Sequence, residues 1–364
     1  MKRLSLLLLL LPLLLLFSLS ASAAEPEEYV DELYGGLPSL SRDALPDELN
    51  EESLAEAIGI RHLAEVMLSG ASEAAPRLLR IFLRLLGMAL LLALFHQLGG
   101  DAGGGARVAE MALSAASCLL LYESFSPLFA GAVSYLSDMA ALSEHAAPIM
   151  GALYAAGGNI ATAAASGGVM AALSLLLEFL CGETLLPLIR VMLGFLLVSS
   201  LGEVRTDGVM ASLRNLYMLL IGFFSVLIAA SQAFGNALGS ARDSFSLRTL
   251  KFAVGQMLPV VGGTVSGSLG TAMASLGLLR GTAGVTVAAA VLLPLLPIVT
   301  ELLLSRLGLG LLAGVSGMLG ATSAGRLFSS FRSLFDLVLA AVSVSSLLFL
   351  FIAASFARCA PVAL

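Results

Sequence analysis

Charged side chains are scarce in this chain. Only 12% of its 364 residues are Asp, Glu, Lys or Arg, while 58% are hydrophobic. Soluble domains carry about 25% charged residues. A water-soluble chain of this length could not hide so much apolar surface, so lipid must be the solvent for much of it. The composition therefore excludes an ordinary soluble protein and predicts an all-α polytopic membrane protein.

Tryptophan is absent and cysteine is rare. Without Trp belts at the bilayer interface, Tyr, Phe and Arg must anchor the helices. The cysteine count is odd, and each cysteine lies in or beside an apolar run, which does not favour a disulfide framework. The three are Cys118, Cys181 and Cys359.

Catalytic and nucleotide-binding motifs are also missing. Gly314-Val-Ser-Gly matches the short pattern of intramembrane serine proteases, but that chemistry needs a His base and no His follows the motif. His62, His96 and His145 are too scattered for a metal site. No G-x-x-x-x-G-K-[ST] loop occurs, so the chain does not use ATP itself. We expect a protein that is not an enzyme, has no cofactor and binds no nucleic acid.

The N-terminus has the pattern of a secretory signal peptide. Lys2 and Arg3 precede a Leu-rich run, and Ala21-Ser22-Ala23 fits a small-x-small cleavage site. We predict a signal peptide over residues 1–23, the alternative being an uncleaved signal anchor. Either interpretation places the following segment outside the cytoplasm.

Residues 24–76 form an acidic segment. Thirteen acidic and two basic side chains give it a net charge of −11, whereas residues 77–364 carry twelve acidic and fifteen basic ones, a net charge of +3. Apolar residues at roughly helical spacing over 51–68 predict an amphipathic helix outside the membrane. This extracytoplasmic segment is either a solvated linker or a docking surface for a partner.

Residues 77–364 form the predicted multi-pass transmembrane domain. A helix needs about 20 apolar residues to cross the hydrocarbon core, and the sequence offers seven to eight such windows. Arg and Lys within 236–282 place that loop inside by the positive-inside rule. Two further stretches, 146–165 and 252–280, are spans, half-helices or re-entrant segments. The predicted spans are 81–98, 106–122, 166–181, 185–202, 215–235, 283–304 and 334–356, with a weaker eighth at 305–323.

Prolines and glycines suggest an internal repeat. Pro148 and Pro187 are 39 residues apart, Pro259 and Pro297 are 38 apart, and each first proline precedes a Gly-Gly pair. With eight spans, the two halves would run in opposite directions, as in inverted-repeat transporters with broken helices. The alternative is convergent composition in a Leu-, Ala- and Gly-rich chain.

A few polar or helix-breaking positions are candidates for the lining of a conduit. Charges inside apolar spans are costly, so they face protein or water. Their alternative roles are snorkelling and structural ion pairs, and the charged members could pair with each other. The candidates are Glu178, Arg190, Glu301, Pro259, Gly262 and Gly263.

Glycine pairs at four-residue spacing, such as Gly310-x-x-x-Gly314, recur in the predicted membrane domain. This spacing lets helix backbones approach closely. Packing within one chain and a homo-oligomer interface are both compatible with it.

One segment resembles a known family. Leu250-Lys-Phe-Ala-Val-Gly-Gln-Met-Leu-Pro-Val-Val-Gly-Gly263, continued by Leu276-Gly-Leu-Leu-Arg-Gly-Thr-Ala-Gly284, is similar to the stage III sporulation protein AE family of endospore-forming bacteria. The resemblance extends to the signal peptide, the acidic exported segment and the span pattern from about residue 78.

The resemblance implies a sporulation role in the mother-cell membrane around the engulfed forespore. Its implied partners are other stage III sporulation A proteins, one of them a separate ATPase, and stage II sporulation protein Q. Together they form a channel-like, secretion-like complex that sustains forespore development. The resemblance implies no catalytic residues. A stand-alone secondary transporter and a scaffold acting through residues 24–76 are the rival hypotheses.

Overall fold

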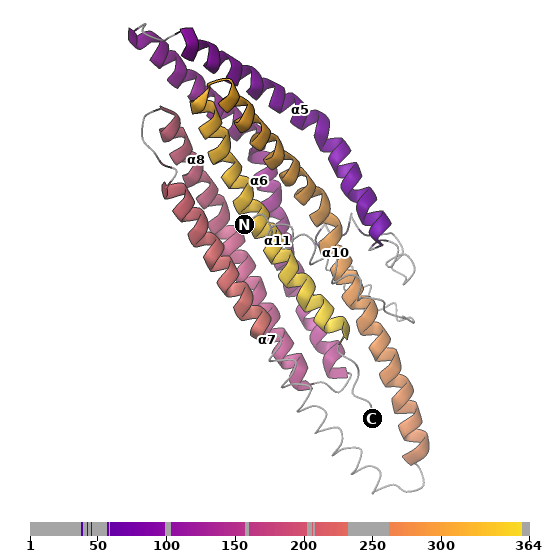
Figure 1. Cartoon of the computed structure of the whole chain (residues 1–364). Coiled ribbons are helices and arrows are strands. Elements are labelled where there is room, and N and C mark those ends of the chain that lie inside the picture. The colour runs from indigo at the N-terminus through magenta and orange to yellow at the C-terminus, as the bar shows by residue number, and fades with distance from the viewer. Residues whose placement is uncertain are drawn as a thin grey trace.

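The computed structural model consists of long helices (Figure 1). The residues that it describes contain no strand. The elements are α5 (Ile60–Leu98), α6 (Gly103–Ala156), α7 (Ile160–Leu176), the π-helix η1 (Leu177–Leu185), α8 (Leu186–Leu201), an unlabelled helix Gly208–Ser231, α10 (Gly262–Met318) and α11 (Thr322–Arg358). The structure describes residues 59–98, 103–156, 160–201, 208–231 and 262–358, with the single positions Pro38, Arg42, Leu45, Ala57 and Thr206.

Six helices of the described chain are long and apolar enough to cross a membrane. This confirms the predicted all-α polytopic membrane protein, and six agrees roughly with the predicted seven to eight. The signal peptide (1–23), most of the acidic segment and Pro259 lie outside the described residues. The membrane-length helices are Arg61–Phe95, Val108–Pro148, Gly167–Ser199, Gly208–Ser231, Val285–Met318 and Thr322–Phe351.

Two pairs of predicted spans are each one continuous helix. The windows 166–181 and 185–202 merge in α7, η1 and α8, and the windows 283–304 and 305–323 merge in α10. Polar residues lower the hydropathy between the windows without ending the helix. At 1.5 Å per residue, the 57-residue α10 is about 85 Å long, well beyond one bilayer. The boundary predicted after residue 76 also falls inside α5.

The two halves of the suggested repeat run in the same direction. Contacts of Ser143 with Met170 and of Ser174 with Ala140 make α7 antiparallel to α6. Glu110 and Tyr135 of α6 meet Ser323 and Ser346 of α11 in the same order, so α11 is parallel to α6.

Because α10 and α11 form a hairpin, α10 is parallel to α7 and α8 (Figure 1). The first half consists of the continuous helix α7–η1–α8 and the returning helix Gly208–Ser231. The second half consists of α10 and the returning helix α11. This differs from the inverted order expected with eight spans, because the first merger reverses the helix Gly208–Ser231, whereas the second merger gives α11 its predicted direction again.

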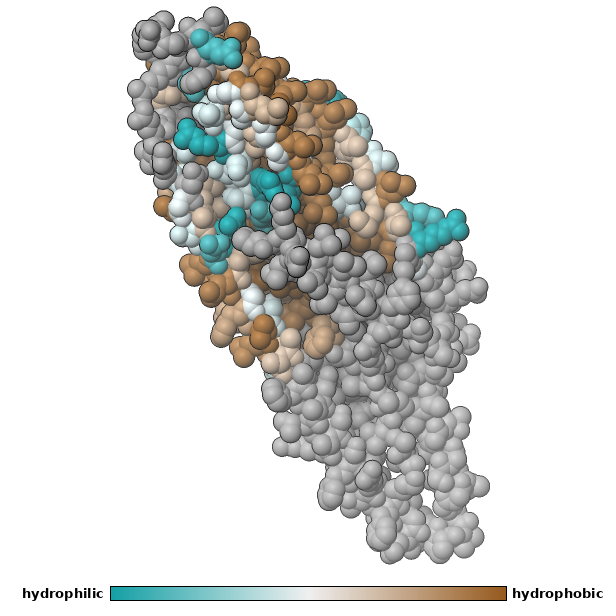
Figure 2. All heavy atoms as spheres, in the orientation of Figure 1, coloured by the Kyte–Doolittle hydropathy of each residue, from teal (hydrophilic) through white to brown (hydrophobic). Residues whose placement is uncertain are grey.

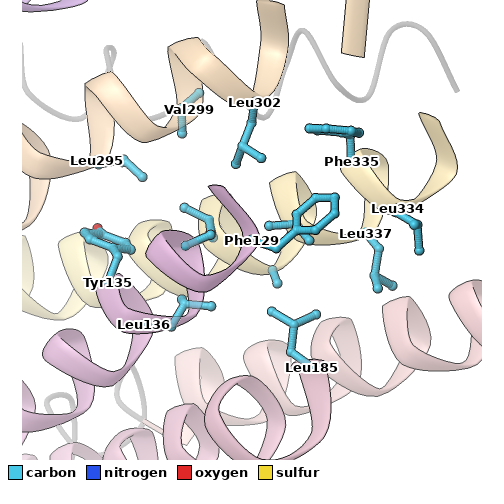
Figure 3. Packing of buried hydrophobic residues seen from close by; sticks show 14 of the residues in the cluster. Phe129, Tyr135, Leu136, Leu185, Leu295, Val299, Leu302, Leu334, Phe335 and Leu337 are labelled. Carbon is cyan, nitrogen blue, oxygen red and sulfur yellow. The ribbon is translucent and has the colours of Figure 1, made fainter. Parts of the chain in front are cut away.

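The core forms around α6, which packs against every other labelled helix. Phe125 and Phe129 of α6 lie against Phe331 and Phe335 of α11, with ring centroids 5.0 to 6.2 Å apart. Figure 3 shows Leu295, Val299 and Leu302 of α10 directed toward the part of the core that holds Phe129 and Phe335. The outer surface carries many exposed apolar side chains (Figure 2), as lipid contact requires.

Candidate functional site: the polar segment of α10

Polar side chains interrupt the apolar sequence of α10 at the start of its C-terminal third. We call Thr300, Glu301, Ser305 and Arg306 the polar segment of α10. The hydroxyls of Thr300 and Ser305 are buried and have no hydrogen-bond partner among the described residues. Ionisable groups inside a membrane helix are expensive and usually functional or paired. The segment is therefore the strongest candidate site in the described part of the chain.

Glu301 pairs with Arg77 of α5. Its side chain is only 19% exposed, whereas that of Arg77 is 51% exposed. The helices can approach here because Gly70 of α5 lies against Pro297, where an added Cβ would be 3.2 Å from the proline ring. The pair joins α5 to α10 and neutralises a charge that would otherwise be costly between helices.

Arg306 pairs with Asp336 of α11. Both side chains are partly buried, 25% and 32% exposed. Arg306 comes five residues after Glu301, which turns it toward α11 while Glu301 faces α5. The polar segment thus holds one ion pair on each side, and α10 is fixed to both neighbours by charge.

Tyr135 connects three helices in the core. Its hydroxyl donates to the carbonyl of Val291 at 3.1 Å and lies 2.8 Å from the hydroxyl of Ser346. Oγ of Ser346 is also 2.7 Å from the carbonyl oxygen of Val342. The Ser346 hydroxyl can therefore donate its single proton either to that carbonyl or to the Tyr135 oxygen. Tyr135 and Ser346 are fully buried. This polar contact fixes α6 against α10 and α11 at one register.

Replacing Tyr135 by Phe should lower the free energy of unfolding by roughly 0.6–1.7 kcal/mol, the range found for hydrogen bonds between membrane helices. The ring stays in place, so the loss reports the hydroxyl alone. Unfolding in mixed micelles measures it. Tyr122→Phe is the matched control, because Tyr122 is 44% exposed on the same helix. Equal losses in both variants would contradict a special role for Tyr135.

The π-helix η1 lies in the middle of the α7–α8 helix, where the sequence predicted a break. Pro187 lies two residues after its end. A proline ring clashes with the carbonyl four residues earlier, here that of Glu183, and a wider turn relieves that clash. Thr184 donates its hydroxyl to the carbonyl of Phe179 at 2.7 Å, which stabilises the wide turn. The helix therefore continues through the predicted break.

The structure separates the predicted conduit residues. Glu178 in η1 and Arg190 in α8 are exposed, and neither has an ion-pair partner within the described ranges. Glu301 pairs with Arg77 instead of with either of them. Gly262 and Gly263 open α10. Their role as a lining stays a prediction.

Sequence reasoning missed Arg77, Arg306 and Asp336. Arg306 fell at the junction of two predicted spans, where a charge is unremarkable, and Arg77 fell at the predicted domain boundary. A single long helix across 283–323 would have drawn attention to Arg306 as a charge inside a membrane-length helix. Its partner on α11 could still not have been found from one sequence.

The described residues offer little evidence for a metal site or a small-molecule pocket. Among the described residues, no group of three or more His, Cys, Asp or Glu could hold a metal ion. A depression of about 300 Å³ is lined by Gly208, Val209, Ser212, Leu213 and Leu216, all from one helix, and is open to the surface. It lacks the convergent polar groups that fix a ligand.

Comparison with known proteins identifies a family. The family model for stage III sporulation protein AE matches residues 52–359, which include all the membrane-length helices. No curated protein and no solved structure matches the chain.

Proposed function

The chain belongs to the stage III sporulation protein AE family, and on that premise we propose that it is a membrane subunit of the channel complex between mother cell and forespore. Family membership makes it a stage III sporulation protein, and the six long apolar helices of its described part make it a multi-pass membrane protein. In this proposal it resides in the mother-cell membrane around the forespore, with its N-terminal segment extracytoplasmic.

The observation that carries the proposal is the family match over residues 52–359. The proposed partners are other stage III sporulation A proteins, including a separate ATPase, and stage II sporulation protein Q. A polytopic body without a nucleotide-binding loop suits a component served by another protein's ATPase. The acidic segment before α5 is a candidate docking surface between the two membranes.

Within this complex, the chain contributes to a transport conduit or gates it. The polar segment of α10 supports the gating version, because its two ion pairs hold α10 between α5 and α11. Breaking either pair would let α10 shift against a neighbour. A small relative movement of packed helices is an established kind of switching transition.

Reconstitution tests the channel. The full chain, combined with its partners in vesicles, should pass small solutes, while the chain alone should not. Uptake by the chain alone, driven by an ion gradient, would instead favour a secondary transporter. Deleting residues 24–56 should abolish assembly with partners if that segment is the docking surface. Unchanged assembly would remove the segment from the proposal.

Substitution of Glu178 and Arg190 tests the lining. Both are exposed and outside any ion pair of the described part, so Glu178→Gln with Arg190→Gln should leave folding intact and reduce sporulation and solute flux together. Glu301→Gln is added separately, because it also breaks the pair with Arg77. The control is Arg61→Gln with Glu65→Gln, a surface pair on α5. If the combined triple variant sporulates and transports normally, the lining hypothesis fails.

A further inference from the structure

We propose that an arginine strip on α5 binds the headgroup phosphates of anionic phospholipids. The strip consists of Arg77, Arg80 and Arg84. It goes beyond the channel role, since it concerns how this chain is held by the bilayer, and it does not depend on that role.

The strip lies where the sequence of α5 changes from polar to apolar. Residues 60–76 carry the acidic side chains of the helix and several polar ones, and residues 85–95 are entirely apolar. A helix that passes from polar to apolar in this way crosses the membrane interface at the junction. Arginine near such a junction reaches the phosphate layer with its head while its stem stays in the apolar region.

The three arginines share one face of the helix. Spacings of three and four residues place them within about 60° of each other around the axis. Arg80 and Arg84 are exposed. Arg80 donates its Nε–H to the carbonyl of Pro76 at 3.2 Å, which orients its side chain along the helix.

The strip borders a lipid-facing surface. On one side of it, Leu78, Ile81 and Leu85 are buried in the core. On the other, α5 exposes a row of leucines that continues into the apolar half. These are Leu79, Leu83, Leu90 and Leu94, each between 48% and 60% exposed. Exposed leucines beside exposed arginines match a phospholipid, whose acyl chains and phosphate need both surfaces.

Little negative charge competes for the strip. The sequence has no Asp or Glu from residue 74 to residue 100. Two acids lie at the Arg77 end of the strip: Glu73, four residues before Arg77 on the same helix, and Glu301, which pairs with Arg77. Arg80 and Arg84 have no acidic partner in the part of the chain that the structure describes, so two guanidinium groups are available. Each can hold a phosphate through a bidentate pair of hydrogen bonds.

The chain's own acidic segment is the rival occupant. Residues 24–56 could fold back onto the strip, since they carry eleven acidic side chains and one basic. A phospholipid fits better, because the strip is continuous with exposed leucines and a polyacidic peptide offers them no acyl chain. Deletion of the segment separates the two occupants.

Lipid titration of the purified full chain tests the inference. The probe is phosphatidylglycerol against phosphatidylcholine in mixed micelles, read by native mass spectrometry of bound lipid. Near an anionic surface each arginine is worth about a fivefold gain in affinity, so Arg80→Gln with Arg84→Gln should weaken phosphatidylglycerol binding roughly 25-fold. Phosphatidylcholine binding should not change. Arg61→Gln is the matched control, because Arg61 is 94% exposed on the same helix but pairs with Glu65.

The possible results distinguish phospholipid binding from coverage of the strip by the acidic segment. Undiminished phosphatidylglycerol binding by the double variant would overturn the proposal, as would an equal loss in Arg61→Gln. A large gain in phosphatidylglycerol binding on deleting residues 24–56 would show that the acidic segment covers the strip in the intact chain, and would also overturn it. The thermal midpoint in phosphatidylcholine micelles confirms that each variant is folded.

Discussion

Asp336→Arg should destabilise the hairpin of α10 and α11 by about 2–4 kcal/mol, less than a fully buried pair would lose because both side chains keep some exposure. The substitution faces Arg306 with a second positive charge. The hairpin is the most extensive helix contact in the described structure, so the effect should spread to the whole bundle. Unfolding in mixed micelles, together with the yield of folded protein, measures the loss.

Exchanging the charges should restore much of that loss. The double variant Arg306→Asp with Asp336→Arg recreates an ion pair in reversed order, so its stability should exceed that of either single variant. Arg326→Asp is the control, because Arg326 is exposed near the start of α11. If the double variant is as unstable as the sum of the single ones, the pair does not stabilise the hairpin.

Gly308→Val should separate α5 from α10. A Cβ built at Gly308 overlaps the ring of Phe82, so any larger residue must displace that ring. Overpacking of this kind costs about 1–3 kcal/mol. The thermal midpoint in detergent should fall, and α5 should become more accessible to protease.

Truncating the opposing ring should rescue the variant. Phe82→Ala combined with Gly308→Val frees the space that the valine needs, and this double variant should be more stable than Gly308→Val alone. Gly314→Val is the matched control in the same helix, since no atom lies within 4 Å of a Cβ there. A loss at Gly314 equal to that at Gly308 would show that the contact with Phe82 is not its cause.

The residues substituted in these experiments, controls aside, lie in α10 or contact it. Its neighbours are held by ion pairs at Glu301 and Arg306, by the ring of Phe82 at Gly308, and by the hydroxyl of Tyr135 at Val291. Lipid provides no hydrophobic force between helices, so close packing and polar contacts must decide their arrangement. This is why single changes along α10 are expected to affect the whole bundle.

Local composition was enough to predict the class of protein. Hydropathy windows identified the apolar helices because each window reports only its own residues, and family similarity was readable from 250–263 and 276–284. Glu301 was recognisable as a charge in an apolar context for the same reason. The windows failed at 182–184 and 304–306, where short polar stretches look like loops although the helix continues.

Only the tertiary structure decided which residues the polar side chains between the helices contact. Arg77 and Glu301 are 224 residues apart in sequence, and Tyr135 meets Ser346 across 211 residues. Nothing local in the sequence encodes such a pairing, since it depends on the direction and register of every helix between them. The sequence by itself therefore determined that this protein is a bundle of apolar helices with a few embedded charges. The fold decided that Glu301, together with the Arg306–Asp336 pair that the sequence did not reveal, holds α10 between α5 and α11, because only packing brings distant helices together.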